Sequence, residues 1–400
     1  MIGTPIRGLA LAGALTCAFA LGACGDDGGS APSATNASNG SGGSAVADAK
    51  AVIAKAQDGL VYATTRAPTR PSQILPYGQW RGPTSAPKPK TGMNVQVITC
   101  SKQAPGCTVP AQAAVEAANA LGWKADVVDG AGTPEGFARA FDTALGRHPD
   151  AIITVALSTS LVGDSLAKAK AQGVLTEVLA ETPPPASYDG PRYSAYVSFP
   201  TVAENAIAAW KEIADQDGHA RVLLIRDGSY QLYLDGVAEY QRIFKTCSGC
   251  STKVIDWQLT DALDPGKVNQ IVGGAVSADP KLTSIFAPYG AGLPNVTQAV
   301  ASTGRSGLVL GSQLGDAISV QSVAAGDSAY TVGNSGGWAG WAAIDQVSRG
   351  LAGKPYLSET EMGVGIGLMT KKDASPKGDF DTIRGMVDYR AEYKKIWGLD

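Results

Sequence analysis

The chain has few histidines and few cysteines, two and six among 400 residues, and no marked excess of charge of either sign. Lysine and arginine number 33 against 36 aspartates and glutamates, which gives a formal net charge of −3. This balance provides no basic footprint for nucleic acid, so no nucleic-acid partner is expected. Two scattered histidines without clustered carboxylates argue against a metal site, and without a Walker loop no phosphate-bearing cofactor is indicated. We therefore expect neither a metal nor a cofactor.

The first residues have the features of an export signal. Arg7 precedes an apolar run over residues 8–24, which is shorter than the roughly 20 residues of a membrane-spanning helix. The run ends in Leu21-Gly22-Ala23-Cys24, which resembles the lipobox of bacterial lipoproteins. We expect a signal peptide over residues 1–23, lipidation of Cys24, and a chain anchored outside the cell membrane. An ordinary cleavage site beside an incidental cysteine is the alternative.

The next two segments differ in composition from the rest of the chain. Residues 24–45 are polar and rich in glycine, and we expect a flexible tether because they cannot repay the entropy of ordering. Residues 46–92 open with helical spacing and continue as a proline-rich arm. The arm contains Tyr77 and Trp80, which we expect to cover apolar surface rather than bind a ligand.

From Met93 onward, short apolar runs alternate with longer amphipathic ones. Strands are expected at residues 94–100, 124–130, 151–157 and 174–181, with helices at 110–122, 135–146 and 161–173 between them. The alternation starts again with a helix at 201–218, followed by strands at 221–228, 251–258, 282–290 and 307–315. This pattern predicts an α/β fold of two doubly wound parallel-sheet lobes, with the ligand near the carboxyl ends of the strands.

Two short motifs resemble those of enzymes, but the sequence around each one argues against that activity. Ser335 lies in a G-x-S-x-G match between a strand and a helix, but both histidines precede it, whereas in that hydrolase order the histidine follows. Cys247 and Cys250 have the spacing of thiol oxidoreductases but follow a predicted helix, whose dipole opposes a thiolate there. We expect no catalytic residues and no enzyme.

The four cysteines of the exported part are expected to form disulfides. Cys247 and Cys250 would make a local link, and Cys100 and Cys107 follow the first strand of the alternating region. A zinc ion shared by both pairs is the alternative, which export and the separation between lobes oppose.

Residues 93–355 resemble the type I periplasmic solute-binding proteins, in particular the sugar-binding branch that serves ABC importers and includes ribose-binding proteins. The resemblance is carried by residues 120–135, 148–174, 282–300 and 330–355. It implies an N-terminal lobe of residues 93–198 and 334–354 and a C-terminal lobe of residues 199–333 and 355–375, joined by a three-segment hinge. Residues 376–400 form a tail without a family counterpart. Since no helix-turn-helix precedes the core, the related regulators are excluded.

The resemblance also implies which loops bind the ligand. Carried over position by position, the ligand-binding residues are Ser101, Lys102, Asp129, Ser158, Thr159, Glu181, Thr182, Asp227, Ser229, Tyr230, Tyr233, Tyr289, Gln313, Asn334 and Trp338. Several charged anchors of sugar binders are replaced here by neutral or aromatic residues, which puts a simple pentose or hexose in doubt. The Cys100/Cys107 loop lies where relatives cover the bound sugar, so we expect it to be a lip of the site.

These features predict a monomeric, non-enzymatic receptor of an ABC import system. It would capture a small neutral or weakly polar solute, sugar-like or aromatic, and present it to a membrane permease. A nucleoside-binding or sensory lipoprotein of the same fold is the first alternative. An extracytoplasmic hydrolase or thiol oxidoreductase is the second.

Overall fold

The computed structural model describes residues 40–57, 59–62, 75–76, 79–382 and 387–399. The expected signal peptide, Cys24, most of the tether and Tyr77 lie outside these residues. None of the described helices is long and apolar enough to span a membrane. The expected tether is corrected at its end, because α1 (Gly40–Ala56) already begins at residue 40. The reason is tertiary, since Ala45, Ala49 and Val52 are buried in one apolar cluster with α5 (Thr201–Asp215).

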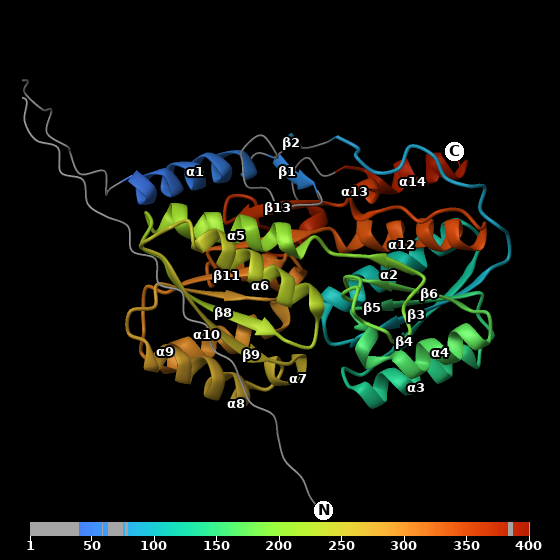
Figure 1. Ribbon diagram of the computed structural model, residues 1–400, viewed down its shortest axis with the longest axis horizontal. Coiled ribbons are helices and arrows are strands. Elements are labelled where there is room, and N and C mark those ends of the chain that lie inside the picture. Colours follow the sequence, from blue (N-terminus) through green and yellow to red (C-terminus); the bar gives the residue numbers. More distant parts are fainter. Residues whose placement is uncertain (1–39, 58, 63–74, 77–78, 383–386, 400) are drawn as a thin grey trace, which may run out of the picture. The chain divides into compact units, whose positions relative to one another are not determined.

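The first sheet has five parallel strands in the order β4-β3-β5-β6-β7. They are β3 (Asn94–Thr99), β4 (Lys124–Asp129), β5 (Ala151–Val155), β6 (Leu175–Leu179) and β7 (Ala195–Val197). Helices α3 (Pro134–Leu145) and α4 (Gly163–Ala171) lie on one face, and α2 (Pro105–Ala120) and α12 (Gly336–Leu351) lie on the other (Figure 1). Strand β5 is buried along its whole length, as a strand covered on both faces must be.

The second sheet has eight strands in the order β2-β1-β13-β12-β11-β10-β8-β9. Its parallel part consists of β8 (Arg221–Asp227), β9 (Ser251–Trp257), β10 (Ser284–Ala287), β11 (Val309–Leu314) and β12 (Tyr330–Asn334). Strands β13 (Gly365–Thr370), β1 (Gly59–Tyr62) and β2 (Leu75–Pro76) extend it with antiparallel pairings. The α/β class is thereby confirmed, and the expectation of an all-parallel second sheet is corrected at this edge.

The helices of the second half flank this sheet. Helices α5 and α6 (Gln231–Phe244) pack together, and α1 lies on α5 (Figure 1). The others are α7 (Leu259–Ala262), α8 (Pro265–Val268), which continues through a π turn into α9 (Gly274–Ala278), α10 (Leu293–Ser302) and α11 (Ala317–Ala325). Short helical turns lie at Thr159–Leu161, Gly290–Gly292 and Phe380–Thr382. Strand β7 and helices α7 and α11 were not foreseen, because each is short and has no clear periodicity.

Segments from both ends of the sequence cover α12. The arm residue Trp80 stacks on Trp338 with ring centroids 5.4 Å apart, and Trp338 stacks on Tyr389 at 5.9 Å. Tyr389 begins α14 (Tyr389–Trp397), which follows α13 (Glu359–Met362) and β13 in the chain. Trp397 of α14 donates its indole N–H to Asp345 of α12 at 2.9 Å. Trp80 therefore packs on apolar surface, as its sequence context suggested.

Candidate functional site

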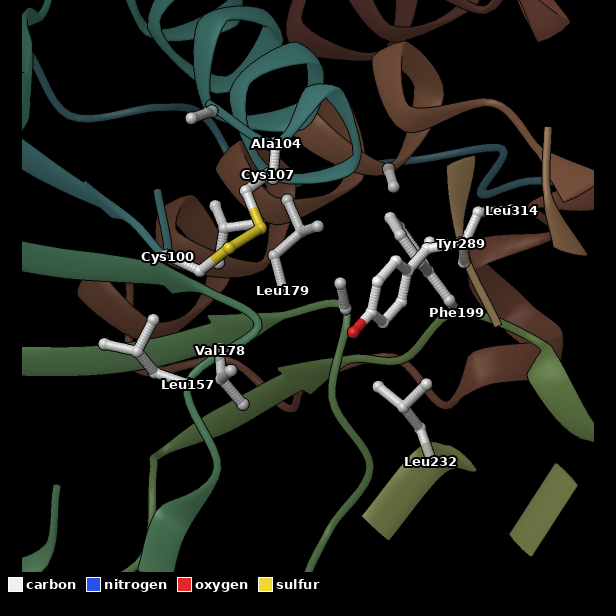
Figure 2. Close-up of a cluster of buried hydrophobic side chains, with 14 of the residues drawn as sticks. Cys100, Ala104, Cys107, Leu157, Val178, Leu179, Phe199, Leu232, Tyr289 and Leu314 are labelled. Carbon is white, nitrogen blue, oxygen red and sulfur yellow. A yellow bond between two sulfur atoms is a disulfide. The ribbon is translucent and has the colours of Figure 1, made fainter. Parts of the chain in front are cut away.

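The carboxyl ends of the two sheets meet around a small cavity with a largely apolar lining. The first sheet contributes Cys100, Ala104, Gly106, Cys107, Ala156 and Ala180, and the connection to α5 contributes Phe199. The second sheet contributes Tyr230, Leu232, Tyr233, Leu259, Tyr289, Ala291, Leu314 and Asp316. Figure 2 shows the Cys100–Cys107 pair on one side of this apolar cluster and Tyr289, Phe199 and Leu314 on the other. A cavity at strand ends is where ligands bind in folds of this kind.

Three tyrosines form one wall of the cavity. Tyr230 and Tyr233 are perpendicular with ring centroids 5.8 Å apart, and Tyr233 lies 5.8 Å from Tyr289. Tyr289 donates its hydroxyl to Asp227 Oδ2 at 3.1 Å, and burial raises the pKa of Asp227 to about 6. The resulting surface is aromatic and largely apolar, with the tyrosine hydroxyl groups as its polar atoms.

The Cys100–Cys107 disulfide forms the opposite side. Helix α2 begins at Pro105 rather than at Pro110 as predicted, so Cys107 lies in its first turn. Proline is favoured in the first turn of a helix, where a backbone N–H would have no partner within the helix. Pro105 and Pro110 are both compatible with a helix start, so the sequence alone did not distinguish them. The disulfide therefore joins the end of β3 to the start of α2, with the two Cα atoms 5.8 Å apart.

Three non-glycine residues at this site have a positive φ angle. Ala156 has φ 54°, Ala180 has φ 61° and Leu314 has φ 73°. Each lies at or directly after the end of a strand, and all three line the cavity. Such conformations disfavour residues with a Cβ and persist where the surrounding structure requires them, often at ligand sites. The strand ends are thus held in sharp turns toward the cavity.

Five more of the predicted residues gather in a polar hollow across the two sets of loops. They are Ser158, Thr159, Glu181, Thr182 and Ser229. Glu181 Oε1 accepts the backbone N–H of Leu232 at 3.3 Å, and Ser158 contacts both Glu181 and the Ser229 carbonyl oxygen. Burial raises the pKa of Glu181. These contacts bind the first sheet's loops to the first turn of α6, so Glu181 and Ser158 join the two sides of the cleft.

The remaining predicted residues lie outside the lining of this cavity, although Asn334 lines the hollow beside it. Gln313 Oε1 accepts from Asn205 at 2.7 Å, and the Asn334 amide donates to Glu204 at 2.7 Å, so both amides hold β11 and β12 to α5. Asp129 accepts the backbone N–H of Lys102 at 3.1 Å and shapes the loop on which Ser101 lies. Trp338 also lies away from the cavity, fully buried between Trp80 and Tyr389.

Several lining residues were missed by sequence reasoning. Phe199, Leu232, Leu259 and Leu314 are apolar and carried no signal that separates a cavity wall from a core. Asp316 had a usable signal, because it directly precedes the run that forms α11 and caps that helix by accepting the Ser319 N–H at 2.9 Å. Its other oxygen accepts the Gly290 N–H at 2.9 Å.

A second small hollow adjoins the cavity. It shares Gly106, Phe199, Leu314 and Asp316 with the cavity and adds Asn334, Asp379 and Asp381, among others. Asp381 accepts hydroxyl hydrogen bonds from Ser335 and from Tyr389, the latter at 2.8 Å. The segment after β13 therefore closes one end of the site.

The two enzyme-like motifs have structural roles here. Ser335 caps α12 by accepting the Trp338 N–H at 2.8 Å, and its hydroxyl contacts Asp381 rather than a histidine. Cys247 and Cys250 are paired with each other directly after α6. In the described part of the chain, no three His, Cys, Asp or Glu side chains come together in a way that could hold a metal ion.

Comparison with known proteins bears on the fold and the family. The family model described as a periplasmic binding protein domain matches residues 95–355. A solute-binding protein of an ABC transporter from Mycobacterium smegmatis, solved with bound glycerol, is 17% identical with a TM-score of 0.62, covering 73% of this chain and 99% of its own.

Two further solved structures are similar. An ABC transporter solute-binding protein from Agrobacterium vitis, bound to α-D-tagatopyranose, is 15% identical with a TM-score of 0.62, covering 70% of this chain and 95% of its own. The glucose-galactose binding protein GanP from Geobacillus stearothermophilus is 16% identical with a TM-score of 0.60, covering 71% and 99%. At these identities the likeness concerns the fold. No curated protein matches the sequence.

Proposed function

Because this chain belongs to the periplasmic binding protein family, we propose that it is a monomeric, non-enzymatic solute receptor of an ABC importer. The lobes would be residues 93–198 with 334–354 and residues 199–333 with 355–375, closing over a small solute that is then handed to a membrane permease. The similar structures named above are solute-binding proteins of such transporters or sugar-binding proteins, which supports this role. Closure of two rigid lobes about short hinges is the established motion of such receptors.

The cavity between the two sheets is the observation that carries this proposal. Its lining is aromatic and aliphatic, with polar atoms at the tyrosine hydroxyls and at Asp316. An aromatic wall and few polar groups suit a small, weakly polar body with an apolar face, either sugar-like or aromatic. Among the described residues, the hydroxyls of Tyr230 and Tyr233 have no hydrogen-bond partner of their own, so they are available to a ligand.

A thermal-shift screen tests the receptor role. The compounds are monosaccharides, polyols, nucleosides, aromatic acids, amino sugars and quaternary amines. A ligand at a hundred times its Kd should stabilise the protein by about 2.7 kcal/mol and be recovered unchanged. Tyr289→Ala should weaken the ligand's affinity tenfold or more, because it removes part of the wall, whereas Leu399→Ala, at an exposed residue, should leave the affinity unchanged. The receptor hypothesis would be wrong if no compound raised the melting temperature, or if a bound compound were chemically converted.

We also propose that the receptor is a lipoprotein on the outer side of the cell membrane. The support is the lipobox ending in Cys24 and the extracytoplasmic location implied by the family. Fractionation of cells expressing the full chain should place it with the membrane, and Cys24→Ser should release it to the soluble fraction. Membrane association that survives Cys24→Ser would contradict the lipid anchor. In this oxidising location, Cys100–Cys107 and Cys247–Cys250 are expected as disulfides.

A further inference from the structure

The residues that line the cavity and the adjoining hollow include carboxylates and no basic side chain. Asp316 lines both hollows, and Asp381 lines the second. No lysine, arginine or histidine of the described chain lines either hollow. We call the region around Asp316, Asp381 and Asn334 the acidic end of the site. An unbalanced negative charge in a water-poor cavity favours a ligand of opposite charge and disfavours an anion.

The carboxylates at the acidic end are held by neutral donors. Asp316 accepts two backbone N–H groups, from Gly290 and Ser319, and Asp381 accepts the hydroxyls of Ser335 and Tyr389. Asp316 is 9% exposed, and among the described residues no basic side chain forms an ion pair with Asp316 or Asp381. These bonds orient the carboxylates. Arg390 is close enough for its charge to act on Asp381, but its ion pair is with Glu116, so the charge of Asp381 is offset only in part.

A second observation at the same place is an amide oxygen without a donor. Asn334 is 2% exposed and lines the second hollow, and its Oδ1 has no hydrogen-bond partner among the described residues. Its Nδ2 is already committed to Glu204. A buried acceptor left unpaired costs roughly 1–3 kcal/mol, so a donor supplied by a ligand would recover that loss. An ammonium group has three N–H donors and no acceptor, which suits carboxylates and an amide oxygen together.

The aromatic wall suits the same ligand. Tyr230, Tyr233 and Tyr289 line the cavity that continues into the acidic end, and aromatic faces attract cations as well as apolar surfaces. Asp227 lies behind this wall and binds the Tyr289 hydroxyl, which adds a negative charge close to the rings. The wall and the acidic end therefore favour one ligand with an apolar face and a positive group.

We propose that the solute carries a positively charged amino group, which binds at the acidic end against Asp316, Asp381 and Asn334 Oδ1 while its body lies on the tyrosine wall. This rests on the proposed receptor function and narrows its ligand to solutes with a protonated amino group, such as amino sugars. Carboxylates and phosphates are excluded by the same charge.

Matched compounds of different charge test the proposal in isothermal titration at neutral pH. Glucosamine, glucose and glucuronate form one set, and galactosamine, galactose and galacturonate form another. Every ligand found in the thermal-shift screen should be cationic, and its neutral twin should bind at least tenfold more weakly. Ligands that are neutral or anionic, or neutral twins that bind equally well, would overturn the amino-group proposal and leave the receptor role standing. A screen without any ligand would end both.

Two variants locate the charge. Asp316→Asn and Asp381→Asn should each reduce the preference for the cation over its neutral twin about tenfold, with the neutral twin's affinity nearly unchanged. Asp327→Asn is the matched control, because Asp327 is exposed just beyond the other end of α11. Since Asp316 caps a helix, Asp381→Asn carries the test if Asp316→Asn does not fold. A cation preference unchanged within twofold in every folded variant would refute this placement.

Discussion

Replacing Glu204 with glutamine is expected to stabilise the protein above neutral pH. Glu204 is fully buried at the start of α5, where Oε1 accepts the Asn334 amide N–H at 2.7 Å and Oε2 has no partner among the described residues. Burial raises the pKa of this carboxyl from 4.5 to about 8. Glutamine keeps the shape and the acceptor for Asn334 without the buried charge.

The direction of the pH effect follows from proton binding. Between about pH 4.5 and 8, Glu204 holds a proton in the folded state and has lost it in the unfolded state, so stability falls as the pH rises through this window. Each unit of that window removes about 1.4 kcal/mol from the free energy of unfolding. Glu204→Gln should therefore reduce the slope of the free energy of unfolding against pH by up to this amount. Burial raises the pKa of Glu212 to about 7, so part of the pH dependence should remain in the variant.

Urea unfolding of the ligand-free protein at several pH values from 5 to 9 measures this effect. The control is Glu135→Gln, which removes an exposed carboxylate from the first turn of α3. Parallel stability profiles for wild type and Glu204→Gln would show that Glu204 does not retain its proton in the folded state.

Removing the Cys100–Cys107 link by a double substitution to alanine should lower the free energy of unfolding by about 2–3 kcal/mol, according to the loop-entropy model. It should also weaken ligand binding, because both cysteines line the cavity and the link holds the start of α2 against the end of β3. Stability is measured by urea unfolding and binding by titration with the ligand found in the screen.

The second cysteine pair provides the matched control for this experiment. Cys247 and Cys250 close a shorter loop, and Cys247 Sγ lies against the Gly218 carbonyl rather than in the cavity. Their double substitution should cost less stability and leave ligand affinity unchanged. Free thiols at Cys100 and Cys107 in a mass spectrum of the unreduced protein would contradict the disulfide, as would equal effects of the two double substitutions on binding.

The regular elements of the alternating region were predictable because their hydrophobic patterns are long and periodic. The helices expected at residues 135–146 and 201–218 match α3 and α5 to within a few residues at their ends. Short elements were missed, such as α7 and β7. Their few residues do not establish a period, and only pairing or packing with distant segments defines them.

The candidate site was predictable only in part. Tyr230 and Tyr289 lie in the loops after β8 and β10, Tyr233 lies in the first turn of α6, and all three line the cavity. Gln313 and Asn334 also lie at strand ends, yet their amides bind α5. The position of each residue in the sequence does not show which group its amide will bond, because the hydrogen-bond partner of a buried polar group is determined by tertiary packing.

The amino-acid sequence by itself determined the α/β class, the two successive rounds of alternation and the strand ends at which a ligand would bind, because these depend on local periodicity and chain order. The tertiary structure decided what no local pattern contains. It placed the Cys100–Cys107 pair opposite a tyrosine wall, brought Asp316 and Asp381 from distant segments to one end of the site, and buried Trp338 under segments from both ends of the chain. Such juxtapositions depend on the packing of residues far apart in the sequence.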